Sequence, residues 1–148
     1  MPHAGLMNER AMGPEAGPLQ RARLHLRGGR RRLRQGKIAA GIVTLADALS
    51  AALEWYTASQ ERRSTIAAGP VDDLRDDKTA YRVLVRSGVL DGKFDLEAFD
   101  RLTEYALEHE LPGFDPAEVL AGIESVMTQL GVMPFDEASL PPEDPKTF

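Results

Sequence analysis

The stretch "KIAAGIVTLADALSAALEWYTASQER" (residues 37–62) carries the strongest helical periodicity in the chain. Its apolar side chains recur every three to four residues and spread over most of the circumference of a helix. The polar side chains fall on one narrow line, formed by Thr44, Asp47, Ser50, Glu54, Thr57 and Glu61. A helix of this kind packs against neighbours on several sides. Residues 37–62 therefore predict a central helix around which the other elements are arranged.

Four further segments show helical periodicity with capping or terminating residues, at about residues 19–36, 72–87, 95–111 and 115–131. Aspartates stand where their N-caps are expected, at Asp72, Asp95 and Asp115. Glycine ends two of the segments, because this residue readily takes the left-handed conformation of a helix C-terminus. No segment shows the period-two alternation of a half-buried strand. The sequence thus predicts an all-α fold, a compact bundle of about five helices.

The 148 residues fit one domain. Residues 19–131 are predicted to form this single helical domain. Residues 1–18 are rich in Gly, Pro and Met without periodicity, which predicts a disordered leader. Residues 132–148 contain four prolines and are predicted to form an extended Pro-rich tail.

Composition excludes several classes of protein. The chain has no cysteine, so it has no disulfide, no thiolate metal site and no cysteine nucleophile. The N-terminus lacks the basic start and apolar run of a secretory signal. No uninterrupted run approaches the roughly 20 apolar residues of a membrane span. We therefore expect a cytoplasmic protein that does not enter a membrane.

The net charge of −5 conceals a division along the chain. Residues 1–37 hold nine basic and two acidic side chains, and residues 38–148 hold nine basic and twenty-one acidic ones. The stretch "RARLHLRGGRRRLRQGK" (residues 21–37) has seven arginines, a lysine and no acid. Helical spacing places four of these arginines on one flank of the helix and spreads the other three around its remaining exposed face. The candidate interaction residues are Arg23, Arg27, Arg30, Arg31, Arg34 and Lys37.

Two interpretations fit this basic helix. It could neutralise phosphates, giving salt-sensitive nucleic-acid binding without sequence preference. It could instead pair with carboxylates, within the chain or across a homodimer, while Leu19, Leu26 and Leu33 pack on residues 37–62. An acidic pI near 5.2 and the lack of aromatic residues among the arginines favour the second interpretation.

A second candidate cluster is "DDLRDD" (residues 72–77), with four carboxylates near a predicted helix start: Asp72, Asp73, Asp76 and Asp77. The helix dipole favours negative charge there. The cluster could bind a cation or receive arginines, but a solvated first turn is the commoner arrangement.

No motif of a known reaction is found. Gly29 and Gly36 are too far apart for a phosphate-binding loop, and Ile38 stands where that motif needs Ser or Thr. Gly92 comes too early for a calcium-binding loop. The Glu-x-x-His pairs of di-iron bundles are absent. The sequence predicts no catalytic residue, no metal site and no cofactor, and it favours a core position for Trp55.

Residues 28–49, "GGRRRLRQGKIAAGIVTLADAL", resemble a single tetratricopeptide-type helical hairpin. The resemblance is carried by Gly29, a Gly-Lys turn at 36–37, Gly41, Leu45 and Ala48. It departs from the family in having Arg32 at the early aromatic position and no second copy at the 34-residue period. The resemblance implies antiparallel packing of the first two helices with glycines at their crossing, and protein binding.

The segment "AYRVLVRSGVLDG" (residues 80–92) resembles a helix of HEPN-type bundles, which are often tied to RNA cleavage or nucleotide transfer. That family's catalytic signature is an arginine followed, after four to six residues, by a histidine. Neither His25 nor His109 has an arginine at that distance upstream. The residues therefore favour a non-enzymatic, cytoplasmic protein-interaction or assembly module that self-associates. The alternative is a nucleic-acid-binding accessory protein that uses the arginine-rich helix.

Overall fold

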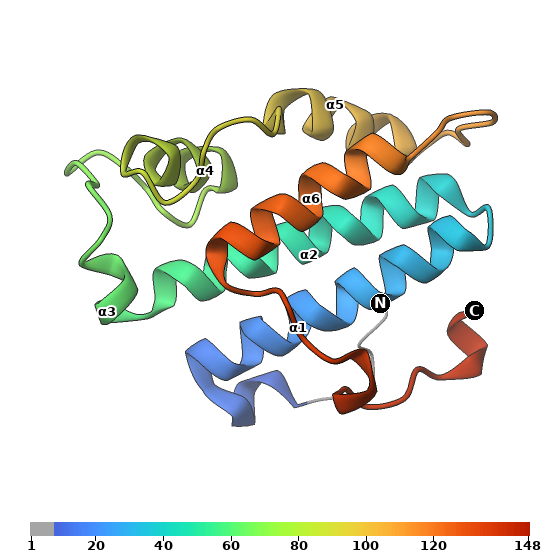
Figure 1. The fold of residues 1–148 in the computed structure, drawn as a ribbon, viewed down its shortest axis with the longest axis horizontal. Helices are drawn as coiled ribbons and strands as arrows, with labels where there is room; N and C mark the ends of the chain where they lie inside the picture. The colour runs from blue at the N-terminus through green and yellow to red at the C-terminus, as the bar shows by residue number, and fades with distance from the viewer. Residues whose placement is uncertain (1–7) are drawn as a thin grey trace.

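The computed structural model describes residues 8–148, and every regular element among them is helical. Figure 1 shows their arrangement. In chain order they are α1 (Glu9–Arg34), α2 (Ile38–Ala58), α3 (Gln60–Arg63), α4 (Asp77–Arg86), α5 (Leu96–Ala106), α6 (Ala117–Leu130) and the 3₁₀ turns η1 (Glu137–Ser139) and η2 (Pro145–Thr147). Because residues 8–148 contain no strand, the predicted all-α class is confirmed.

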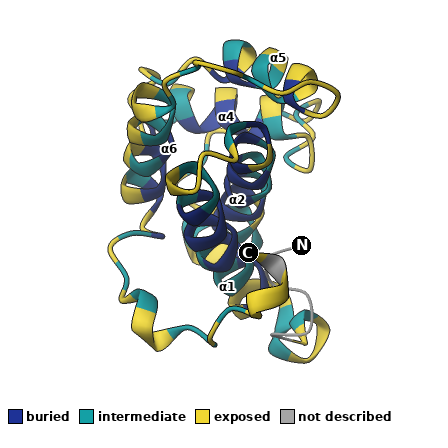
Figure 2. Ribbon diagram, turned by 90° about the vertical axis from the view of Figure 1, so that its right-hand side faces the viewer, coloured by how far each residue is buried: buried dark blue, intermediate teal, exposed yellow. Residues whose placement is uncertain are grey.

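The helix α2 occupies the centre of the molecule. It packs against α1 on one side and against α4, α5 and α6 on the other (Figures 1 and 2). Its buried side chains point in several directions, and include Ile42, Leu45, Ala48, Leu49, Ala51, Ala52 and Leu53. The predicted central position is confirmed, because the wide apolar surface of this helix needs a neighbour on each side.

By length and composition α2 could also cross a membrane. It has 21 residues, and its most apolar 18-residue window has a mean hydropathy of 1.4. This corrects the expectation that no such stretch exists, which rested on uninterrupted apolar runs and overlooked how few charges interrupt this one. In the structure 56% of the window is buried inside the bundle, as in the core helix of a soluble protein.

Two glycines set the close approach of α1 and α2, which run antiparallel (Figure 1). A Cβ atom on Gly29 of α1 would lie 2.7 Å from Leu45 Cδ2 of α2. A Cβ atom on Gly41 of α2 would lie 2.6 Å from Leu33 Cδ2 of α1. Each leucine therefore fills the space left by the glycine of the opposite helix. This reciprocal fit is the packing of the first two helices that the leucine stripe predicts.

The N-terminal part of α1 differs from its prediction. Residues 9–18 are helical, although the sequence predicts a disordered leader over residues 1–18; residues 1–7 lie outside the described part. Asn8 caps this helix by accepting a hydrogen bond from the Ala11 N–H. Gly13 interrupts it with a φ of 91°, so Pro14 stands at the first position of a new helical segment, which also contains Pro18. The Asn8 cap and the break at Gly13 thus give two consecutive helical pieces in a segment whose sequence shows little periodicity.

Other helix boundaries also differ from the sequence prediction. The central helix ends at Ala58 instead of running to Arg62, because Ser59 adopts an extended conformation and caps α3. The third predicted helix begins later, since Asp76 and not Asp72 is its N-cap. The fourth is correctly capped by Asp95 but ends at Ala106, well before Pro112. Gly131 ends α6 with a φ of 93°, as predicted.

The segment of residues 132–148, called the C-terminal segment below, is not a simple extended tail. It contains two 3₁₀ turns and runs back along α1 (Figure 1). Val132 is fully buried, and Met133 and Phe135 pack against the core. The prolines of this segment prevent a regular helix, but its apolar side chains still attach it to the bundle.

Trp55 is half-buried and does not belong to the fully enclosed core. The guanidinium carbon of Arg62 lies 3.9 Å from the centre of the indole ring, and Tyr56 meets the ring edge to face at 6.3 Å. Arg62 also donates a hydrogen bond of 2.8 Å to the Trp55 carbonyl. A cation from α3 therefore covers the indole face that the bundle leaves open.

Candidate functional site

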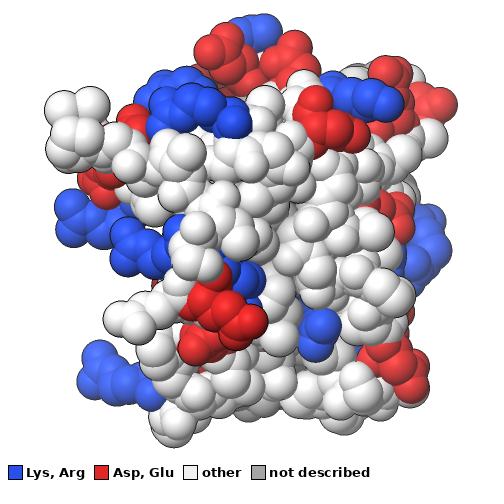
Figure 3. All heavy atoms as spheres, turned by 60° about the vertical axis from the view of Figure 1, so that its left-hand side comes forward, with Lys and Arg blue, Asp and Glu red and all other residues white. Residues whose placement is uncertain are grey.

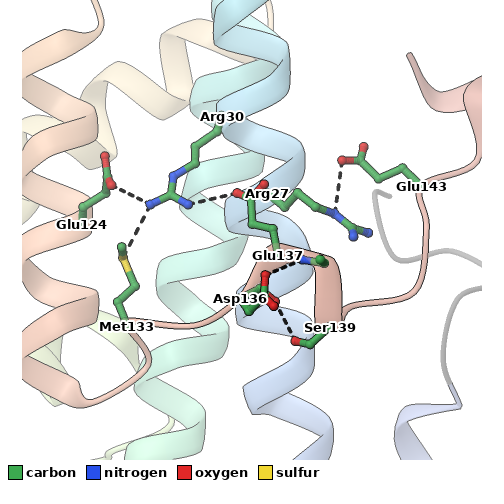
Figure 4. A network of polar contacts seen from close by, with 9 residues as sticks. Arg27, Arg30, Glu124, Met133, Asp136, Glu137, Ser139 and Glu143 are labelled. Carbon is green, nitrogen blue, oxygen red and sulfur yellow. Dashed lines mark hydrogen bonds and ion pairs between the residues drawn. The ribbon is translucent and has the colours of Figure 1, made fainter.

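The arginines of α1 contact the C-terminal segment. We call the residues Arg23, Arg27, Arg30 and Arg31 the arginine face. Figure 4 shows Arg27 and Arg30 extending from α1 towards carboxylates of other elements. The sequence left open whether these cations meet carboxylates within the chain or across a homodimer; in the structure Arg27, Arg30 and Arg31 meet carboxylates of α6 and the C-terminal segment of the same chain.

Glu143 is the carboxylate on which two arginines converge. Its Oε2 atom accepts a hydrogen bond of 2.6 Å from Arg31 Nε, and its Oε1 atom lies 3.2 Å from Arg27 Nε. All three side chains are nearly enclosed, with 9% of Glu143, 10% of Arg27 and 9% of Arg31 exposed. Removing such charges from water costs several kcal/mol per ion, so each needs its partner. Glu143 is thus a main anchor of the C-terminal segment.

Arg30 connects three elements. It pairs with Glu124 of α6 at 2.6 Å and with Glu137 of η1 at 3.0 Å (Figure 4). Arg23 joins the same segment through a 3.1 Å hydrogen bond to the Val132 carbonyl, and its guanidinium lies 5.3 Å from the centre of the Phe135 ring. The arginine face therefore fixes how α6 and the C-terminal segment lie against α1.

Several guanidinium N–H groups near Glu143 remain without a hydrogen-bond partner. Within residues 8–148 these buried atoms are Arg27 Nε, Arg27 Nη2, Arg31 Nη2 and Arg32 Nη1, of which Arg27 Nε still lies within ion-pair distance of Glu143. Burial lowers the pKa of Arg32, and the positive charge of Arg31 lowers it further. The carboxylate of Glu143 thus contacts Arg27 and Arg31 and its charge acts on Arg32, and the donors of these cations exceed its acceptor capacity.

The other two predicted basic residues lie apart. Arg34 and Lys37 are exposed at the end of the α1–α2 hairpin and make no ion pair with any described residue. Arg21, which the sequence did not single out, pairs with Glu9 and Glu54. Burial acts to lower the pKa of Arg21, but the hydrogen bonds and charges of these two carboxylates outweigh it and raise that pKa.

The acidic cluster of residues 72–77 has local structural roles. Asp72 accepts 2.8 Å hydrogen bonds from the Gly69 N–H and from Arg86, and these contacts lower the pKa of its carboxyl. Asp73 pairs with Arg75 at 3.0 Å, and Asp76 caps α4. Burial raises the pKa of Asp77. None of the four contacts the arginine face.

Metal binding has no support in the described residues, which contain no group of three or more His, Asp and Glu side chains able to hold an ion. His109 lies at the C-terminal side of α5, where its ring stacks on Tyr105 with centroids 4.2 Å apart. Figure 3 shows basic and acidic side chains interspersed around a mainly uncharged middle on one face of the molecule. That face therefore does not present a continuous basic surface.

A groove between α5 and α6 is a feature that sequence reasoning missed. It has a volume of about 610 Å³. Its apolar lining includes Phe94, Phe99, Leu102, Phe114 and Val119. Carboxylates at or before the N-terminal starts of the two helices also line it, namely Asp91, Asp95, Asp115 and Glu118, together with one cation, Lys93. The available signal was the three phenylalanines beside acids near the helix starts, but periodicity predicts a position only for Phe99, which is buried, and none for Phe94 and Phe114, which precede the helices.

Gly122 of α6 makes room for an aromatic ring in the wall of this groove. A Cβ atom on Gly122 would lie 2.7 Å from Cδ1 of Phe94, which therefore rests directly on the α6 backbone. Phe94 also stacks at a tilt on Phe99, with ring centroids 5.5 Å apart. The hydroxyl of Tyr81 donates a 2.7 Å hydrogen bond to the Phe94 carbonyl. The aromatic wall of the groove is thus fixed from α4, α5 and α6.

Comparison of the chain with protein-family models, curated proteins and solved structures finds no match. The arginine face and the α5–α6 groove are therefore the features of the structure that bear on function.

Proposed function

We propose that this protein is a non-enzymatic, cytoplasmic interaction module that binds an amphipathic, basic helix of a partner protein in the α5–α6 groove. The observation that carries the proposal is an apolar groove of about 610 Å³ with a rim of four carboxylates and one lysine. An amphipathic helix presents apolar anchors at positions i, i+3, i+4 and i+7, and such anchors fit a groove lined by aromatic and aliphatic side chains.

The charged side chains at the rim of the groove determine which kind of helix can bind there. Asp91, Asp95, Asp115 and Glu118 are all exposed, so each can meet a cation at the rim. Rim charges of this kind raise the association rate and exclude partners of like charge more than they add affinity. A helix with lysines or arginines flanking its apolar stripe matches this pattern, and an acidic helix does not.

The internal pairing of the arginine face disfavours the nucleic-acid alternative. Arg27, Arg30 and Arg31 already contact carboxylates of the same chain, and a nucleic acid would have to displace them. The self-association expected from the sequence remains a prediction, as does the tetratricopeptide resemblance of residues 28–49.

A pair of designed helical peptides tests the proposal. Both carry the same leucine stripe, and their polar positions are lysine in one and glutamate in the other. We expect the lysine peptide to bind at about micromolar dissociation constant and the glutamate peptide to bind at least about tenfold more weakly. Amide NMR shifts should change at Ala98, Val119 and Gly122, which line the groove.

Two variants locate the site. Glu118→Lys reverses one exposed rim charge and should weaken binding of the lysine peptide, whereas Glu110→Lys reverses an exposed charge outside the groove and should not. Equal binding of the two peptides, or equal effects of the two variants, would contradict the proposal. Sedimentation equilibrium of the free protein identifies a second copy as the occupant if Glu118→Lys abolishes a dimer.

A further inference from the structure

The contact between α1 and Glu143 has an excess of positive charge in an enclosed place. Arg27 and Arg31 each have about nine-tenths of their side-chain surface buried, and both contact the carboxylate of Glu143. Arg31 Nη1 is satisfied by Gln35, and the Arg31 guanidinium lies 4.6 Å from the centre of the Phe148 ring. Arg27 Nη2 and Arg31 Nη2 have no hydrogen-bond acceptor among the described residues.

The unsatisfied donors point to an anionic ligand with more acceptors than a carboxylate. Arg27 Nη2, Arg31 Nη2 and Arg32 Nη1 are buried without a hydrogen bond in the part of the chain that the structure describes. A buried donor without a partner costs free energy, most of all on a charged group. An anion that satisfied these donors as well as the two Nε atoms would therefore bind favourably in place of Glu143.

We propose that Arg27, Arg31 and Arg32 form a binding site for a phosphate dianion, and that Glu143 of the C-terminal segment occupies this site when no ligand is bound. A phosphomonoester carries a charge of about −1.5 to −2 at pH 7 and three strong acceptor oxygens. A planar guanidinium pairs with two such oxygens at once. This site lies on α1 and is independent of the α5–α6 groove.

The same chemistry discriminates against the nucleic-acid backbone. A phosphodiester has a single negative charge and two free oxygens, which is no more than the carboxylate of Glu143 already supplies. A dianionic terminal phosphate adds a charge and an acceptor oxygen. The site therefore selects free phosphate or a phosphomonoester over an internal phosphate of DNA or RNA.

Competition with Glu143 lowers the affinity of the wild-type protein. A site that is open for only about a tenth of the time binds its ligand about tenfold more weakly than the open site itself. Replacing the carboxylate by the uncharged amide of similar shape, Glu143→Gln, should therefore raise the affinity for phosphate by at least about tenfold. Ligand binding should also release the C-terminal segment from α1.

Isothermal titration with inorganic phosphate at constant ionic strength tests these expectations. Glu143→Gln should bind at least about tenfold more tightly than the wild type. Adding Arg31→Gln to that variant should abolish the gain, while adding Arg34→Gln, the same charge change at an exposed position of α1, should preserve it. Arg32→Gln serves as a second test of the site if Arg31→Gln fails to fold.

A short oligothymidylate with and without a 5′-terminal phosphate separates the sources of the ligand. Only the phosphorylated form should bind to Glu143→Gln. In the wild-type chain, saturating phosphate should increase amide hydrogen exchange at residues 137–148, which is a readout that needs no variant. The proposal is wrong if Glu143→Gln binds phosphate no better than the wild type, if Arg34→Gln acts like Arg31→Gln, if both oligonucleotides bind equally, or if the exchange is unchanged.

Discussion

The glycine at position 41 provides a test of how α1 and α2 pack. In Gly41→Ala the new Cβ atom would lie 2.6 Å from Cδ2 and 2.9 Å from Cγ of Leu33, and 3.3 Å from its backbone nitrogen. Carbon atoms normally approach to about 3.5–4.0 Å, so the end of Leu33 must move by about 1 Å. The nearby backbone nitrogen means that rotation of the leucine side chain alone does not relieve the crowding.

The magnitude follows from two opposing effects. Overpacking costs about 1–3 kcal/mol, and replacing a helical glycine by alanine returns about 1 kcal/mol of helix propensity. We take the upper half of the overpacking range because the backbone is also crowded, and we expect Gly41→Ala to lower the free energy of unfolding by about 1–2 kcal/mol. In a Leu33→Ala background the Cδ2 and Cγ atoms are gone and only the backbone nitrogen at 3.3 Å remains, which a shift of a few tenths of an ångström relieves, so the same change should stabilise by up to about 0.5 kcal/mol.

Urea unfolding followed by circular dichroism at constant m-value measures all four proteins of this cycle. The exposed Ala40→Gly change in the same helix calibrates the propensity effect and should cost about 1 kcal/mol. The reasoning is refuted if Gly41→Ala is equally destabilising with leucine and with alanine at position 33. The sign of the effect, and not only its size, must depend on Leu33.

Three further predictions concern charged side chains. Glu143→Ala should lower the free energy of unfolding by about 3–5 kcal/mol in urea titrations, because it leaves buried guanidinium groups without their carboxylate; a loss within the scatter of exposed ion pairs would contradict this. The lowered pKa of Asp72 means that its ionised form stabilises the fold at neutral pH, so Asp72→Asn should be less stable than the wild type at pH 7. This difference should shrink as the pH falls below the unfolded value of 3.8 and vanish below the pKa of the folded state, which thermal melts at several pH values can check. Finally, Arg62→Gln should increase acrylamide quenching of Trp55 fluorescence, because it removes the group that covers the indole face; unchanged quenching would show that the bundle alone shields the ring.

Much of the fold follows from local sequence. The wide apolar surface of residues 38–58 predicts a central helix, since neighbours on several sides remove that surface from water. Asp95 and Gly131 mark helix ends because capping depends on a side-chain oxygen or a left-handed backbone at one position. The reciprocal fit of Gly29 and Gly41 with leucines is also consistent with the spacing along the chain, because helical periodicity fixes which residues share a face.

The partner of the arginine face was set by tertiary structure alone. The sequence favoured carboxylates over nucleic-acid phosphates as partners of the basic helix, but twenty-one acids follow residue 37 and none is singled out by spacing. Asp72 was a candidate, yet it lies in a loop held by Gly69 and Arg86. Glu143 is the partner because the chain turns at Gly131 and returns along α1, and charge attraction is non-local and depends on where the backbone places each group.

The α5–α6 groove is a second feature that the sequence alone could not predict, and it depends on apolar side chains. Periodicity predicts burial for Phe99 on the inward face of α5, which is confirmed, but it makes no prediction for Phe94 and Phe114, which precede α5 and α6. Whether such a face is fully covered depends on how far apart two helices lie, which here is decided by the contact of Phe94 with Gly122. The sequence by itself therefore determined the helices, their caps and their inward faces. Only the tertiary structure decided which carboxylate meets which arginine and which apolar face stays open, because both depend on distances between residues far apart in the chain.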